Sequence, residues 1–163
     1  MALNSFLKFE GGKPVEGGSV VDGHDKELQL LGFGCTVHNT GSMHTSTGGG
    51  TGKGEHGDLS FQMELDKAAP LLHKFCMSGQ HFDKVTLFVL KAGGDSPVEY
   101  MRYEMEDVMI SSFSWSGGGG DNIMASGSLN FGKYNYAYVP QSATGTPEGE
   151  IAHGFNIATG KEA

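Results

Sequence analysis

Apolar residues recur at every second position along most of this chain, and that alternation constrains the fold more than any other feature. A period of two puts successive side chains on opposite faces of a β-strand. The alternation is clear in "LSFQMEL" at 59–65 and in "IMASGSLNF" at 123–131, and a third long run covers 98–116. We therefore expect a mainly β protein in which two packed sheets form a barrel or sandwich.

The run "LLGFGCTV" at 30–37 also has strand period. Its larger side chains occupy alternate positions, and we expect them to face the core: Leu31, Phe33, Cys35 and Val37. Gly32 and Gly34 then lie on the opposite face of the same strand, because successive side chains alternate across it.

A change of frame marks the last long strand. The apolar positions in 123–131 are odd-numbered, whereas Tyr134, Tyr136 and Tyr138 are even-numbered. A β-bulge or a bend between two sheets produces such a slip, and Gly132 is the residue at which we expect it.

The segment "VTLFVLK" at 85–91 is apolar on both faces. A strand of this kind is covered twice, by its own core and by something outside it, such as another subunit. We predict that its apolar side chains contribute to a subunit interface: Val85, Leu87, Phe88, Val89 and Leu90.

One helix is expected, at about 66–78. The apolar residues of "DKAAPLLHKFCMSGQ" recur at helical spacing. Asp66 can cap the start of this helix, Pro70 is tolerated in its first turn, and Gly79 suits the left-handed residue at its end.

The 27 glycines cluster between the apolar runs and indicate turns. "AGGDSP" at 92–97 and "SGGGGD" at 116–121 are hairpin signals. The run "TGGGTGKG" at 47–54 lies in the longest connection, 38–57. It is not a phosphate-binding loop, because Thr47 replaces the first required glycine, Gly54 replaces the required Ser or Thr, and a strand pattern follows it.

The net charge of −8 argues against a nucleic-acid partner, which needs a basic surface. No apolar run has the form of a signal peptide or the length of a membrane span. We therefore expect a protein that is made in the cytoplasm and does not insert into a membrane. In that compartment Cys35 and Cys76 are expected to be buried, reduced thiols.

We expect no catalytic, metal or cofactor site. No G-x-S-x-G elbow is present, and the seven histidines follow no metal-binding motif. His38, His44 and His56 share the 38–57 connection and can meet in space, but solvent-exposed histidines are the simpler interpretation. Surfaces that pair with other chains are the better candidate for function.

Several segments, taken together and in order, resemble the haemolysin-coregulated proteins (Hcp), the inner-tube subunits of the type VI secretion system. They include "GSMH" at 41–44, "DLSF" at 58–61, "KAGG" at 91–94 with "VEY" at 98–100, and "LNF" at 129–131. The resemblance covers nearly the whole chain and implies a single tube-subunit domain over 1–163.

The resemblance implies a β-barrel with one flanking helix that assembles into homohexameric rings. The rings stack into a tube with a spike protein at its tip. A contractile sheath expels the tube from a Gram-negative cell, so that the subunit is secreted without a cleavable signal peptide. In some members the lumen holds effector proteins as cargo.

By the same resemblance, the long hairpin loop at about 38–57 protrudes from the ring and meets the next ring. The residues that the resemblance assigns to this stacking loop are Gly41, Ser42, Met43, His44, Gly48, Gly49, Gly50, Gly52 and Lys53. It also assigns Gly32 and Gly34 to the lumen. Many relatives carry a Trp-Ser-Trp-like run where this chain has Phe33-Gly34-Cys35. Gly32 and Gly34 would leave this stretch of the lumen wall wide and featureless, so the resemblance does not identify which effectors are carried.

Two other classes of function remain. A non-tube β-barrel that binds a small ligand would be a monomer in solution. An effector-like enzyme fused to the tube fold would need an appended catalytic domain, for which we expect too little chain after Pro140.

Overall fold

The computed structural model describes residues 3–44, 49–50, 52–91 and 97–163. Within them lie eleven strands and one helix. In chain order these are β1 (Leu3–Glu10), β2 (Leu28–Leu30), β3 (Gly32–Gly34), β4 (Val37–Asn39), β5 (Gly54–His56), β6 (Leu59–Glu64), α1 (Ala69–Ser78), β7 (His81–Lys91), β8 (Val98–Ser116), β9 (Met124–Tyr138), β10 (Ile151–Asn156) and β11 (Lys161–Glu162).

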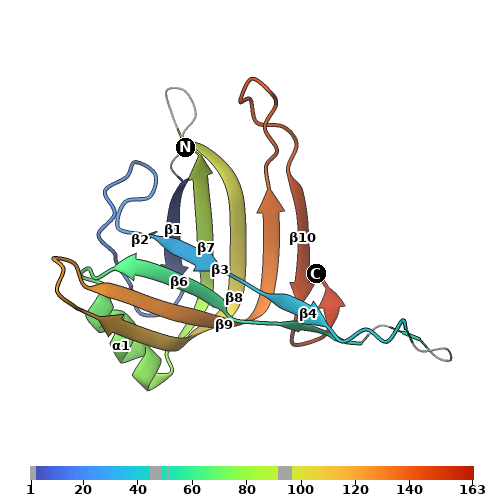
Figure 1. The fold of residues 1–163 in the computed structure, drawn as a ribbon, viewed down its shortest axis with the longest axis horizontal. Coiled ribbons are helices and arrows are strands. Elements are labelled where there is room, and N and C mark those ends of the chain that lie inside the picture. The colour runs from blue at the N-terminus through green and yellow to red at the C-terminus, as the bar shows by residue number, and fades with distance from the viewer. Residues whose placement is uncertain (1–2, 45–48, 51, 92–96) are drawn as a thin grey trace.

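Two layers of antiparallel strands pack against each other, and β8 and β9 belong to both (Figure 1). One layer has the order β2, β1, β7, β8, β9, β10, β11, and the other has β3, β6, β9, β8. The first half of β8 and the second half of β9 belong to the first layer. The second half of β8 and the first half of β9 belong to the second layer. The predicted fold class, mainly β with two packed sheets and one flanking helix, is confirmed.

The two long strands bend together. Asp107 has a φ of 54°, and it lies opposite Gly132 between the paired residues Glu106↔Lys133 and Val108↔Phe131. In both strands the core-facing positions switch between odd and even residue numbers at this point. Because both strands switch together, the pairing between them continues without a shift. Here β9 also exchanges its other neighbour, from β6 to β10. The predicted bend at Gly132 is confirmed, and a separate register shift lies between Ile110 and Ser112.

The core lies between the layers, and α1 closes one end of it. Leu72 and Phe75 of the helix are buried. The helix begins at Ala69 rather than at 66, and the prediction that Asp66 caps it was wrong: the N-cap is Ala68, without a side-chain cap. Asp66 instead accepts a hydrogen bond from the Ala68 backbone N–H at 2.8 Å in the turn before the helix. Gly79 ends the helix with a φ of 69°, as predicted.

The outer face of β7 is covered by the chain itself. Val85, Leu87 and Val89 lie in the core and Leu90 is also buried. On the outer face, the His24 ring stacks on Phe6 at 4.6 Å between centroids and contacts Phe88 at 5.0 Å. The loop around His24 therefore supplies the second cover that the sequence suggested for another subunit. A role for these five β7 residues in a subunit interface stays a prediction, and their burial within the protomer gives it no support.

The segment 30–37 departs from the prediction. Leu30 is buried, whereas Leu31 is 57% exposed and Val37 64% exposed. The chain passes at Leu31 from the edge of β1 to the edge of β6, which breaks the single strand that was expected. Phe33 pairs with the buried Phe61 and faces the same side, but its own side chain remains 36% exposed. The prediction that this run forms a buried core face was wrong.

Both thiols are free, but neither is fully buried as predicted. Cys76 is half-buried against the core, whereas Cys35 is exposed. The same break at Leu31 explains the difference, because it carries Cys35 to the edge of the fold. Among the described residues, no helix has the length and apolar character needed to cross a membrane.

Candidate functional site

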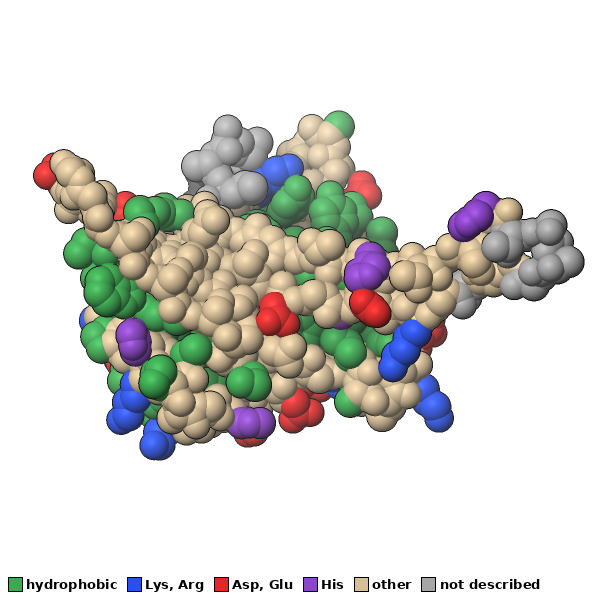
Figure 2. Space-filling model, turned by 60° about the horizontal axis from the view of Figure 1, so that its bottom comes forward, with side chains coloured by type: hydrophobic (Ala, Val, Ile, Leu, Met, Phe, Trp, Pro, Cys, Tyr) green, Lys and Arg blue, Asp and Glu red, His purple; other side chains and the backbone are tan. Residues whose placement is uncertain are grey.

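One face of the second layer is built from small polar residues. We call it the serine face; its members are Gly32, Gly34, Ser60, Gln62, Ser112, Ser114, Ser126 and Ser128. The pairing register sets them in two rows across four strands: Gly34, Ser60, Ser128 and Ser112 form one, and Gly32, Gln62, Ser126 and Ser114 the other. Figure 2 shows this side of the molecule as a broad area where polar, uncharged side chains and backbone predominate.

Hydrogen bonds between neighbouring strands fix the hydroxyls of this face. The Oγ atoms of Ser112 and Ser128 lie 2.6 Å apart, and those of Ser114 and Ser126 lie 2.7 Å apart. At one end Asp58 accepts hydrogen bonds from Ser111 Oγ at 2.6 Å and from Asn130 Nδ2 at 2.8 Å. The hydroxyls of this face are therefore held in place, and its members other than Gln62 are small.

Gly32 and Gly34 lie on the serine face, as their alternation predicts. A Cβ on Gly34 would approach only Ser60 Oγ, at 3.4 Å, and one on Gly32 would lie 3.2 Å from Gln62 Oε1. Both positions are thus open toward the space in front of the sheet. Their assignment to a lumen stays a prediction.

The four-stranded part of this layer ends in two free edges. Among the described residues, β3 pairs only with β6, and the 112–116 part of β8 pairs only with β9. An unpaired edge presents a row of backbone N–H and C=O groups that can pair with another chain. The serine face therefore continues up to two edges that are available for such pairing.

A hairpin arm extends from one end of the molecule (Figure 1). Within the described part of the chain, strands β4 and β5 pair only with each other, and every β4 residue is exposed. Farther along the arm, the Ser42 N–H donates to Gly50 O at 3.0 Å, and Asn39 Nδ2 donates to Gly52 O at 2.7 Å. A Cβ on Gly52 would collide with Thr40 O, so this glycine permits the close approach of the two sides of the arm beyond β4 and β5.

The arm carries most of the stacking loop that the sequence predicts. Gly41, Met43, His44, Gly49 and Lys53 are exposed on it, and Met43 is 76% exposed. Gly48 lies outside the described residues. Protrusion of the loop is confirmed for its described part, whereas contact with another ring stays a prediction.

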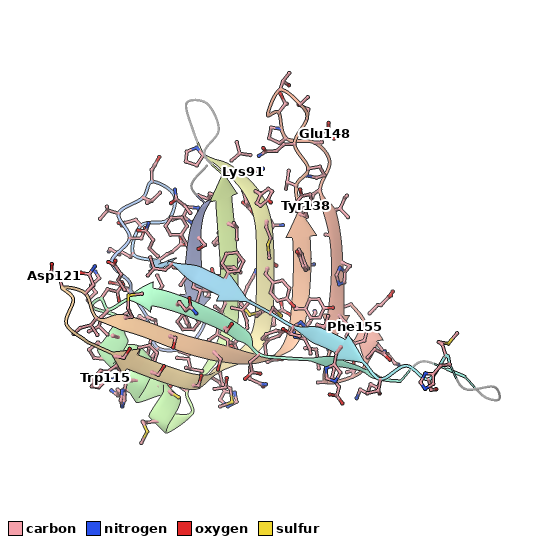
Figure 3. The ribbon with its side chains drawn as sticks, viewed as in Figure 1. Lys91, Trp115, Asp121, Tyr138, Glu148 and Phe155 are labelled. Atoms are coloured by element: carbon pink, nitrogen blue, oxygen red, sulfur yellow. The ribbon has the colours of Figure 1, made fainter. Side chains whose placement is uncertain are left out.

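The core is open at the end away from α1. A cavity of about 400 Å³, which we call the mouth cavity, is lined by residues that include Phe33, Cys35, Val37, His56, Tyr103 and Tyr136. A second cavity of about 210 Å³ lies next to the mouth cavity and is lined by Phe155 and Ile157, among others. Val37, His56 and Tyr134 line both cavities. Figure 3 shows Phe155 on the arm side of the molecule, opposite Trp115.

Polar groups inside the mouth cavity are paired with one another. His56 Nδ1 donates to Gly57 O at 2.7 Å, so in the neutral ring Nε2 accepts from the Tyr103 hydroxyl at 2.6 Å. Burial raises the pKa of Tyr103 above its usual range. Cys35 as a whole residue is exposed, but partial desolvation of its thiol at the cavity raises the pKa of Cys35 as well. Both groups are therefore neutral at pH 7, and the cavity is apolar with a satisfied polar pair.

The three histidines of the long connection do not meet. His38 pairs with Glu55 at 3.2 Å on the exposed arm, and His56 lies in the mouth cavity. No cluster of three or more His, Cys, Asp or Glu side chains suited to a metal occurs in the described part of the chain. Sequence reasoning did not find the mouth cavity, because Tyr103, Tyr134 and His56 come from three separate strands.

The far end of the molecule carries a second exposed apolar area. Trp115, on the free edge of β8, is 59% exposed, and its Nε1 donates to His73 Nδ1 of α1 at 3.4 Å. A hollow of about 510 Å³ beside it is lined by Leu65, His73 and Ile123, among others. Apolar groups thus remain exposed at both ends of the serine face.

Comparison with known proteins gives a consistent result. Residues 6–138 match the family described as type VI secretion system effector, Hcp. The protein hcp1 of Pseudomonas aeruginosa is 36% identical over 165 residues, and the alignment covers 100% of both chains.

Solved structures agree with this match. A structure described as a type six secretion system protein has a TM-score of 0.91 at 28% identity, over 99% of this chain and 100% of the other. Hcp1 from Salmonella typhimurium has a TM-score of 0.79 at 28% identity, over 100% of both chains.

Proposed function

The chain belongs to the Hcp family of type VI secretion proteins, and we propose that it is the structural subunit of a secretion tube. In this proposal the whole chain forms one domain, six copies close into a ring, and rings stack into a tube. The tube is expelled from the cell and carries effector proteins in its lumen. A spike protein at the tip and a contractile sheath around the tube are its other partners, and the subunit has no catalytic role.

The observation that carries the proposal is the serine face between two free strand edges. Its four strands alternate in direction, so β3 and the end of β8 run antiparallel. A copy placed at one edge can continue the alternation without a break. Head-to-tail contacts of this kind join two different surfaces and close into a ring when the rotation permits.

The same arrangement supports a lumen lined by the serine face. Small hydroxyl side chains and two glycines leave room in front of the sheet, and an uncharged, ordered surface suits weak and reversible contact with cargo. Gly32 and Gly34 then line the channel. The arm extends beyond the body of the protomer, where it is available to contact a neighbouring ring.

Light scattering of the purified protein tests the ring. We expect about 104 kDa, which is six times the subunit mass of 17.3 kDa. A variant in which a short turn replaces residues 41–53 is expected to keep that mass, because a protruding loop contributes little to the core. Electron microscopy of this variant should show rings but no stacks. A subunit that stays at 17.3 kDa at micromolar concentration would overturn the proposal.

The mouth cavity favours one second candidate, a binding module for a small apolar ligand. Its open apolar lining is of the kind that such ligands occupy. The same light-scattering experiment separates the two functions, since a binding module of this type would remain a monomer. A mass of six copies would support the tube subunit and contradict the monomeric binding module.

A further inference from the structure

We propose that Trp115 of one copy lies over the mouth cavity of the next copy and anchors the junction between them. This inference rests on the proposed ring and identifies the partner of the mouth cavity as a second copy of the chain. It joins the β8 edge of one subunit to the β3 edge of its neighbour. Three independent observations support it: the mouth cavity is uncovered, Trp115 is exposed, and the two strand edges agree in direction and in side-chain face.

The mouth cavity lacks a cover in the isolated subunit. Phe33 is 36% exposed, Tyr136 is 37% exposed and Val37 is 64% exposed at its rim. An apolar patch of this kind on a soluble protein marks an interaction site. The cavity adjoins β3, which is one of the two free edges of the serine-face sheet.

Trp115 is an exposed aromatic side chain at the other free edge. It is the one tryptophan of the chain, it is 59% exposed, and its hydrogen bond to His73 holds the indole against α1. Tryptophans that are fixed before binding are common anchors of protein interfaces, because they bury a large area and lose little conformational freedom.

The two edges match in direction and in side-chain face. Phe33 pairs with the buried Phe61, and Trp115 pairs with the buried Ala125, so both lie on the side of the sheet that faces the core. Gly34 and Ser114 lie on the serine face instead. An antiparallel junction between β3 and the end of β8 therefore keeps the serine face continuous and puts Trp115 on the same side of the joined sheet as Phe33 and Cys35 of the neighbour.

A native cysteine makes this geometry testable. Cys35 lies at the rim of the mouth cavity and is free, so Trp115→Cys supplies a partner thiol on the facing edge. On mild oxidation we expect disulfide-linked oligomers of up to six chains on a non-reducing gel. Ser114→Cys is the matched control, because it is one residue away but on the serine face. Adding Cys35→Ser to Trp115→Cys should abolish the ladder.

A second variant tests the anchor without cross-linking. Trp115→Ala is expected to raise the protein concentration needed for half-assembly of the ring by tenfold or more, with an unchanged circular dichroism spectrum. Met77→Ala is its control, since Met77 is another large apolar side chain, 81% exposed, and it lies on α1 rather than on a strand edge. An equal change in both variants would count against the anchor.

The outcomes separate this inference from the proposed function. If the wild-type protein is a monomer, both are overturned. If rings form but Ser114→Cys cross-links to Cys35 as readily as Trp115→Cys, the edges meet with the wrong faces and this inference alone is overturned. The same holds if rings form and Trp115→Ala assembles like the wild type.

Discussion

The two ends of the core differ in how their apolar side chains are covered. At the α1 end, Leu72, Phe75 and Phe82 are between 0% and 3% exposed. At the mouth, Phe33 and Tyr136 retain 36% and 37% of their exposure. The chain supplies a helix as a lid for one end and no equivalent segment, among the described residues, for the other.

This difference separates folding from assembly. Side chains at the α1 end are buried within the subunit, so their burial contributes to the free energy of unfolding of that subunit. Side chains at the mouth gain further burial only when another molecule covers them. We therefore expect substitutions at the first end to act on the fold and substitutions at the second to act on the oligomeric state.

The largest expected effect comes from emptying the closed end. Phe75→Ala should lower the free energy of unfolding by about 3–5 kcal/mol, because it leaves a cavity in a packed core. Phe33→Ala at the mouth should lower it by only about 1 kcal/mol. Urea titration of both variants, at a concentration where light scattering shows monomers, measures the two values.

Assembly should respond in the opposite order. Phe33→Ala is expected to weaken the ring more than its effect on the subunit explains. Equal losses of unfolding free energy in the two variants would contradict the comparison, since the mouth would then be as well packed as the closed end.

A smaller effect distinguishes the two faces of the second layer. A Cβ on Gly127, which faces the core, would lie 2.6 Å from Phe61 Cζ and 3.0 Å from Ser112 O. Gly127→Ala should therefore cost about 1–3 kcal/mol by overpacking. Gly34→Ala, on the serine face, should change stability by no more than about 0.5 kcal/mol. Thermal unfolding of the pair measures the difference, and a stable Gly127→Ala would show that this part of the core is loose.

The alternation of residues predicts which side chains share a face but not whether that face is covered. Leu59, Phe61 and Met63 alternate and are fully buried, because the other layer packs over them. Leu31 and Val37 alternate in the same way, yet they remain exposed at an edge of the fold. Cover is a property of the tertiary structure, and a single strand carries no signal for it.

The candidate surfaces were predictable to different degrees. Gly32 and Gly34 could be placed on one face from their spacing alone, and the protruding loop from its length and composition together with the family resemblance. The mouth cavity could not, because Tyr103 and Tyr134 meet only through the register of β8 and β9. That register depends on the simultaneous change of frame at Asp107 and Gly132. The sequence shows the switch of apolar positions from odd to even numbers before Tyr134 in β9. It does not show the matching switch at Asp107 in β8.

The smallest expected effect concerns the polar pair in the mouth cavity and appears only at alkaline pH. Burial raises the pKa of Tyr103, so the unfolded chain loses this proton at about pH 10, before the folded chain does. The stability that Tyr103 contributes is therefore complete below about pH 10 and is lost as the pH rises above it. Urea midpoints should fall in this window for the wild type and fall less steeply for Tyr103→Phe, which has no hydroxyl to titrate. Cys35→Ser, measured in parallel, removes the separate contribution of the thiol, whose pKa is also raised. Identical slopes for Tyr103→Phe and the wild type would mean that water reaches the Tyr103 hydroxyl, and the mouth would then be more open than its packing indicates.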